Sequence, residues 1–140
     1  MAIERIVVAS DRSETATRAV AWVAEMARRY EAHLTVVQVY VPGPPPADAE
    51  SLLTAYAEEV VGPGTGTRVG IGDDPGDAIV AAAEAENADV LVVGNLGMSG
   101  RREFLLGNVP NRVSHNSRCT VVIVNTTGET TKSKLPWRRK

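Results

Sequence analysis

Apolar residues along this chain follow two patterns. Some short runs are apolar almost throughout, and between them apolar residues recur every three or four positions. The first pattern is typical of strands buried on both faces, and the second of helices that bury one face. The runs predict strands over 3–9, 33–40, 67–71, 90–93 and 120–125. Because the two patterns alternate, the sequence predicts an α/β fold, a doubly wound five-stranded parallel sheet with helices on both faces.

Cap signals mark where the predicted helices begin. The polar turn Ser10–Ser13 precedes the first helical pattern, and Asp48 precedes the second. Asp74, followed by a proline, begins a third helix that should run to about Asn87. Serine and aspartate accept hydrogen bonds from the free N–H groups of a first helical turn, and proline suits the first helical position. A fourth helix is expected over 107–117.

Length and composition favour one soluble domain. The chain has 140 residues and a single cysteine, Cys119. No apolar run approaches the roughly 18 residues of a membrane span. One cysteine excludes an internal disulfide, which is typical of a reducing cytoplasm. We therefore expect a cytoplasmic protein, and the short apolar runs predict no membrane segment. We expect the domain to cover 1–126, and 127–140 to form a basic tail or linker.

Charge is distributed unevenly along the chain. Residues 132–140 hold five of the fifteen lysines and arginines and no acidic residue. The preceding residues therefore carry ten basic against seventeen acidic side chains, a net charge of −7. Because nucleic-acid affinity rests largely on neutralising phosphates, a body this acidic argues against a nucleic-acid partner.

A glycine-rich stretch follows the fourth predicted strand. Gly94 ends the apolar run, Gly97 follows, and Gly107 opens the last helical pattern after nine intervening residues. Glycine lets the backbone approach a ligand, and the free N–H groups of a loop and first helical turn suit an anion, most often a phosphate. The first two glycines alone would only turn the chain out of a strand. The spacing to Gly107 favours a phosphate site.

The glycine spacing resembles the nucleotide-binding motif of the universal stress protein family: Gly, two residues, Gly, nine residues, Gly, then Ser or Thr. The chain matches every glycine and has Asn108 at the last position. The segment 3–13 is similar to the family's opening strand and Asp-x-Ser turn, and Gly72–Pro75 to its Gly-Asp-Pro step. The resemblance covers 3–125 and implies the strand order 3-2-1-4-5. It also implies binding of ATP or AMP, with or without Mg²⁺.

The resemblance also implies roles for single residues. Asp11 and the neighbouring backbone would contact the adenine end of the nucleotide, and Val39 would pack on the base. The loop glycines, with Asn108 and the backbone of Val109, would hold the ribose and phosphates. The predicted nucleotide-binding set is Ala9, Ser10, Asp11, Val39, Gly94, Asn95, Gly97, Gly107, Asn108 and Val109.

Simpler interpretations of these residues stay open. A lone aspartate such as Asp11 is more often a turn or helix-cap residue. Asn108 can either donate to a phosphate oxygen or cap the last helix. Arg101 and Arg102 lie in the loop and are candidate phosphate contacts, although adjacent surface arginines are usually only solvated.

No motif for catalysis accompanies the glycine loop. The sequence lacks G-x-x-x-x-G-K-[ST] and G-x-S-x-G, and no G-x-G-x-x-G follows the first strand. Two histidines and one cysteine do not build a usual zinc site. We therefore expect no catalytic residue and no metal site. The favoured function is ATP binding in stress or energy-state signalling, and the alternatives are an interaction module with an empty cleft and a slow ATPase.

The last predicted strand, Thr120–Asn125, has no following strand to cover its edge. An exposed edge strand tends to pair with another chain, and members of the resembling family commonly dimerise through this strand. We expect an antiparallel homodimer across it. A protein partner that the sequence does not identify would respond to the state of the loop Asn95–Leu106.

Overall fold

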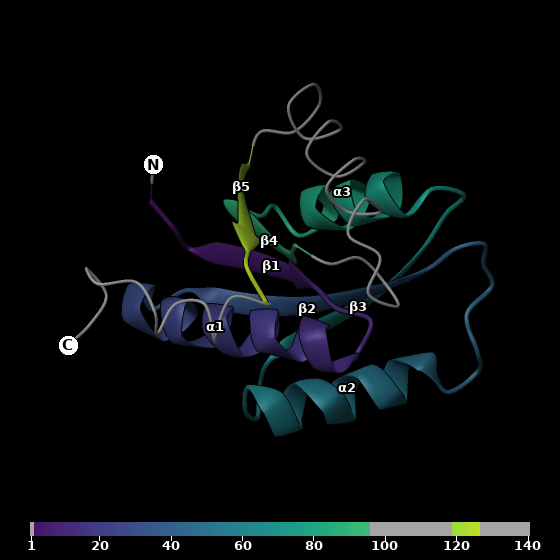
Figure 1. Ribbon diagram of the computed structural model, residues 1–140, viewed down its shortest axis with the longest axis horizontal. Coiled ribbons are helices and arrows are strands. Elements are labelled where there is room, and N and C mark those ends of the chain that lie inside the picture. Colours follow the sequence, from purple (N-terminus) through teal and green to yellow (C-terminus); the bar gives the residue numbers. More distant parts are fainter. Residues whose placement is uncertain (1, 96–118, 127–140) are drawn as a thin grey trace.

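The computed structural model describes residues 2–95 and 119–126. Within them, strands and helices alternate from the amino terminus as far as β4 (Figure 1). The strands are β1 (Arg5–Ala9), β2 (His33–Tyr40), β3 (Gly66–Ile71), β4 (Val90–Gly94) and β5 (Thr120–Val124). The helices are α1 (Glu14–Tyr30), α2 (Ala49–Val60) and α3 (Pro75–Ala85).

The strands form one parallel sheet in the order β3-β2-β1-β4-β5, which confirms the predicted fold class and strand order. β1 is the central strand. The register pairs Ala9 of β1 with Val37 of β2, and Val8 with Val92 of β4. Because β2 and β4 lie on opposite sides of β1, the direction in which the chain adds strands reverses there. Ligand sites of open α/β sheets lie at such reversals, beyond the carboxyl ends of the strands.

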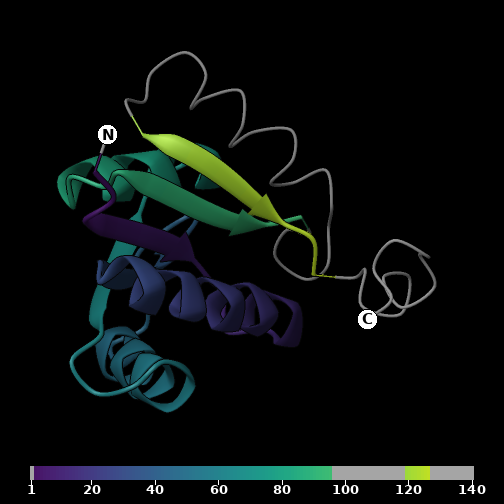
Figure 2. The ribbon, with the colours of Figure 1, turned by 90° about the vertical axis from the view of Figure 1, so that its left-hand side faces the viewer.

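Helices cover both faces of the sheet (Figures 1 and 2): α1 and α2 lie on one face and α3 on the other. Successive strand side chains point to opposite faces, so each strand supplies both cores. The core under α1 and α2 consists of Ile6, Val8, Val20, Val23, Ala24, Ala27, Leu34, Val36, Leu53, Ala57, Val90 and Val92. The core under α3 consists of Val7, Val37, Val39, Ala78, Ile79, Val80, Ala82, Ala83, Leu91 and Val93.

Of the three helix starts predicted from cap residues, two have the expected side-chain hydrogen bond. Ser13 Oγ accepts a hydrogen bond from the N–H of Ala16 at 3.2 Å, and Asp74 Oδ2 accepts one from Asp77 at 2.9 Å. Asp48 occupies the N-cap of α2, but its side chain makes no cap hydrogen bond. α3 ends at Ala85, two residues before the expected end, because the backbone turns left-handed at Asn87, where φ is 55°.

Candidate functional site

The chain leaves the sheet at two neighbouring points of its carboxyl edge. β1 ends at Ala9 and its neighbour β4 ends at Gly94. The turn Ser10–Ser13 follows the first strand and Asn95 follows the second. The adjacency on which the site hypothesis depended is therefore present. It lies at the reversal of strand order, where such a fold accommodates a ligand.

The turn Ser10–Ser13 is held by hydrogen bonds of its own residues. The N–H of Ser10 extends the sheet by donating to Val37 O at 2.8 Å. The N–H of Arg12 donates to Ser10 Oγ at 3.0 Å, and that of Ser13 donates to Asp11 Oδ1 at 3.0 Å. Arg12 has φ of 66°, a left-handed conformation that is uncommon for any residue but glycine. The turn is thus a defined structure.

Asp11 acts as a turn residue, as its simpler interpretation predicted, since its Oδ1 accepts from the N–H of Ser13 two residues later. A carboxylate offers about four acceptor positions, so this single bond leaves capacity for a ligand donor. Asp11 is partly exposed. A role in the turn and a role in binding are compatible, and the binding role stays a prediction.

Asn95 ties the end of β4 to the end of β5. Its N–H donates to Val124 O at 2.8 Å, and its Oδ1 accepts from both the N–H and the Oγ1 of Thr126, at 3.0 and 2.9 Å. Its Nδ2 donates to Asn125 Oδ1 at 3.3 Å. The side chain of Asn95 is therefore engaged in holding the two strand ends together. A ligand contact from it, as predicted, would have to compete with these bonds.

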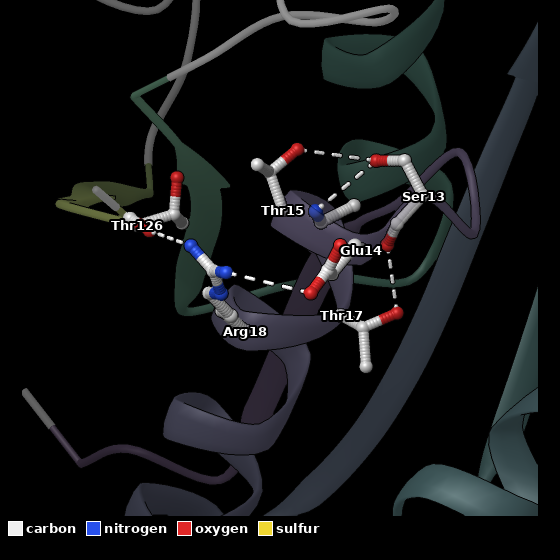
Figure 3. A network of polar contacts seen from close by, with 7 residues as sticks. Ser13, Glu14, Thr15, Thr17, Arg18 and Thr126 are labelled. Carbon is white, nitrogen blue, oxygen red and sulfur yellow. Dashed lines mark hydrogen bonds and ion pairs between the residues drawn. The ribbon is translucent and has the colours of Figure 1, made fainter. Parts of the chain in front are cut away.

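Arg18 of α1 completes this junction (Figure 3). Its Nη1 donates to the carbonyl oxygen of Thr126 at 2.7 Å, and its Nη2 lies 3.5 Å from Glu14 Oε2. Thr126 is buried, with 4% of its surface exposed. The first turns of α1, the end of β4 and the end of β5 are thus joined through one buried residue. The sequence analysis did not single out Arg18 or Thr126.

The apolar members of the predicted set are closely packed. Val39 is 6% exposed and belongs to the core under α3, and Gly94 is buried. Ala9 packs against the same core and is partly exposed. In the register of β1 and β2, Val39 lies two residues beyond Val37, the partner of Ala9, and hence closer to the edge. These positions agree with an apolar wall beside the turn, and only a small part of the Val39 side chain is accessible to a base.

The remaining predicted residues lie outside the described part of the chain. They are Gly97, Arg101, Arg102, Gly107, Asn108 and Val109. Their roles at the phosphates stay predictions.

Sequence analysis missed Gln38 and Tyr56. Gln38 of β2 is 8% exposed and its Oε1 accepts from Arg12 Nε at 3.1 Å. Tyr56 of α2 reaches Ser10 with its hydroxyl group, at 3.0 Å from Oγ. A signal existed for Tyr56, because a tyrosine on the inner face of a predicted helix needs a partner for its hydroxyl group. Which partner it finds depends on the tertiary fold.

Two other classes of site find no support among the described residues. Within 2–95 and 119–126, no three His, Cys, Asp or Glu side chains are grouped so that they would hold a metal ion. In the same residues no helix is both long and apolar enough to cross a membrane. A cavity of about 260 Å³ lies at the opposite edge of the sheet, between the ends of α1 and α2, with small apolar residues such as Ala24 and Ala27 in its wall. Neither the turn Ser10–Ser13 nor Asn95 lines it.

Known proteins resemble the chain over nearly its whole length. Residues 2–125 match the model of the universal stress protein family. A universal stress protein of Mycobacterium tuberculosis is 32% identical over 145 aligned positions, which cover 90% of this chain and 99% of that protein.

Two similar solved structures contain adenine nucleotides. One is a universal stress protein in complex with cAMP, with 33% identity and a TM-score of 0.69 over 91% of this chain and 100% of that one. The other is a universal stress protein from Archaeoglobus fulgidus in complex with dAMP, with 25% identity and a TM-score of 0.61 over 89% and 100% of the two chains.

Proposed function

Because the chain belongs to the universal stress protein family, we propose that it binds an adenine nucleotide where β1 and β4 end. The observation that carries the proposal is the adjacency of the turn Ser10–Ser13 and Gly94 at the reversal of strand order. Relatives with cAMP and dAMP bound favour the same class of ligand. The glycine spacing 94, 97, 107 favours a ligand with phosphate groups, and we propose ATP or AMP, with or without Mg²⁺.

The proposed division of roles follows the chemistry of the residues. The carboxylate of Asp11 only accepts hydrogen bonds, so it suits the donor groups of an adenosine, and Val39 and Ala9 supply apolar contact for the base. The loop after Asn95 supplies N–H groups for the phosphates. Arg12 places a cation beside the same turn, held by Gln38.

Calorimetric titration tests the binding site. We expect wild-type protein to bind ATP in the micromolar range, about −7 to −8 kcal/mol, as a preformed cleft would. Asp11→Ala should weaken binding about tenfold by removing a charged acceptor. Gly97→Val should abolish it by blocking approach of the backbone to the phosphates.

Glu58→Ala provides a matched control, since it removes one exposed carboxylate from the outer face of α2, away from the turn. Each variant should keep the wild-type circular dichroism spectrum. Unchanged affinity in Asp11→Ala and Gly97→Val, with the fold intact, would refute the site. Mass spectrometry of small molecules released from purified, denatured protein would identify which adenine nucleotide is retained.

Binding without efficient catalysis is the second part of the proposal. The protein would act in stress or energy-state signalling in the cytoplasm, with the nucleotide biasing the loop that a protein partner recognises. A ligand shifts such an equilibrium only by the difference between its affinities for the two states. The alternatives remain an interaction module with an empty cleft and a slow ATPase. Release of phosphate from ATP at a steady rate by purified protein would favour the ATPase.

We also propose a homodimer across β5. In the described part of the chain β5 pairs only with β4, and Ile123 is 41% exposed on it. Such an edge tends to recruit a further strand. Sedimentation at tens of micromolar should show a dimer. Thr120 and Val124 bond to the β4 side, so the N–H of Ile123 points away from β4, and Ile123→Pro should yield monomers by removing it. A wild-type monomer under these conditions would contradict the proposal.

A further inference from the structure

A buried serine and a tyrosine from another layer meet behind the candidate turn. Ser10 is 6% exposed at the end of β1, and its Oγ donates to the hydroxyl oxygen of Tyr56 on α2 at 3.0 Å. The same tyrosine oxygen lies 2.8 Å from Oγ1 of Thr17 on α1. Tyr56 therefore joins α2 to both the end of the central strand and the first turns of α1.

The direction of the hydrogen bonds follows from counting donors. Thr17 has one hydroxyl hydrogen, which it donates to the carbonyl oxygen of Ser13 at 2.8 Å. The hydroxyl of Tyr56 must then donate to Thr17, and its oxygen accepts from Ser10. Ser10 Oγ in turn accepts from the N–H of Arg12 at 3.0 Å. These four hydrogen bonds form a chain with a single donor direction. It runs from the N–H of Arg12 through three hydroxyl groups to the carbonyl of Ser13.

Both ends of this chain lie in the turn that follows β1. Hydrogen bonds arranged head to tail polarise one another, so the middle member affects the strength of the end bonds. The turn needs such support, because Arg12 adopts a left-handed conformation. Tyr56 is the member that comes from outside the segment 10–17, and its hydroxyl group joins α2 to the turn by a hydrogen bond.

We propose that Tyr56 is a positioning residue for the turn Ser10–Ser13, and that it sets the affinity for the adenosine end of the nucleotide through Asp11. The inference rests on the proposed function for its ligand, and on the described contacts for its mechanism. Asp11 lies between the two residues that the chain fixes, Ser10 and Arg12. Its carboxylate is therefore oriented by a helix 45 residues further along the sequence.

Tyr56→Phe tests this with little change in packing, because the ring that packs at the margin of the core under α1 and α2 is retained. The buried hydroxyl of Ser10 loses its acceptor and must turn toward another one. Ser10 Oγ is then no longer held in place by Tyr56, so the hydrogen bond that it accepts from the N–H of Arg12 weakens. We expect amide hydrogen exchange of Arg12, followed by NMR without nucleotide, to become about fivefold faster, as the weakening of one hydrogen bond implies.

Binding measurements separate the positioning role of Tyr56 from a general loss of stability. Affinities for ATP and for adenosine should both fall about three- to fivefold, so that their ratio stays at the wild-type value. The ratio is constant because the altered contacts lie at the adenosine end and the phosphate loop is untouched. In a Ser10→Ala background, Tyr56→Phe should have a much smaller effect on both affinities, because only the link through Thr17 to Ser13 is left to break.

Tyr30→Phe is the matched control. It removes the same hydroxyl group from a tyrosine that is 55% exposed at the end of α1. It should change neither the exchange of Arg12 nor the affinities.

Unchanged exchange of Arg12 in Tyr56→Phe would overturn the positioning role. A loss confined to ATP, with adenosine binding unaltered, would overturn it too, because the effect would then come from the phosphate end. If wild-type protein binds neither ATP nor adenosine while Tyr56→Phe accelerates the exchange of Arg12, the proposed function fails and the hold of Tyr56 on the turn stands.

Discussion

Two aspartates lie at opposite edges of the sheet and are bound in different ways. Asp89, just before β4, accepts the N–H groups of Glu4 and Arg5 with one oxygen, at 2.8 and 2.9 Å. Asp11, just after β1, accepts the N–H of Ser13, two residues later. The first carboxylate joins segments that are 84 and 85 residues apart in the sequence. The second stabilises only its own turn.

Aspartate therefore has two roles in this fold, one structural and one at the candidate binding site. The backbone around Asp89 is fixed as well, since its N–H donates to Arg5 O at 2.8 Å and its carbonyl accepts from Thr120 at 3.0 Å. The two backbone N–H groups, of Glu4 first and then of Arg5, hold the pKa of the Asp89 carboxyl below its ordinary value. Asp89 therefore fastens β1, β4 and β5 at the amino edge, while Asp11 retains acceptor capacity at the edge where a ligand would bind.

Replacing each aspartate by alanine should separate stability from binding. Asp89→Ala leaves two N–H groups without their charged acceptor, so we expect the melting temperature to fall by several degrees, with ATP affinity of the folded protein unchanged. Asp11→Ala should lower the melting temperature much less, because it removes one hydrogen bond within a turn. Differential scanning calorimetry of the two variants, with and without ATP, measures both effects.

Asp89→Asn serves as the control for charge, since its amide oxygen can still accept both N–H groups but without the negative charge. It should melt between wild type and Asp89→Ala. If the alanine variants of Asp89 and Asp11 melted at the same temperature, the distinction between the two edges would be wrong.

The fold was predictable because its signals are local and repeated. Strands buried on both faces are apolar throughout, and the run 33–40 coincides with β2. Asp74 and the proline after it set the start of α3 for a local reason as well. Asp48 shows the limit, since a suitable residue at the N-cap did not form the cap bond. Such a bond depends on a backbone conformation that the residue type does not determine.

The site was predictable in position and less so in detail. The place of Asp11 and Gly94 followed from strand order, which the family resemblance supplied. The engagement of Asn95 with Thr126 did not, because it depends on where β5 ends relative to β4. The contact of Ser10 with Tyr56 joins residues 46 positions apart, and neither residue indicates the other in the sequence. Contacts between layers of the fold need the tertiary arrangement.

The smallest expected effect is the pH dependence of the stability that Asp89 contributes. The pKa of this carboxyl is lowered in the folded state, so its contribution to stability is present above the ordinary aspartate value of about 3.9 and is lost as pH falls through the folded-state pKa. The difference in melting temperature between wild type and Asp89→Ala should therefore be constant from about pH 7 to pH 5 and shrink below about pH 4. The pKa of Glu25 is also lowered, chiefly by its hydrogen bond to Arg29, but that pair is present in both proteins and cancels in the difference. A difference that persisted unchanged at the lowest pH at which both proteins fold would mean that the ionised carboxylate is not what fastens the amino edge.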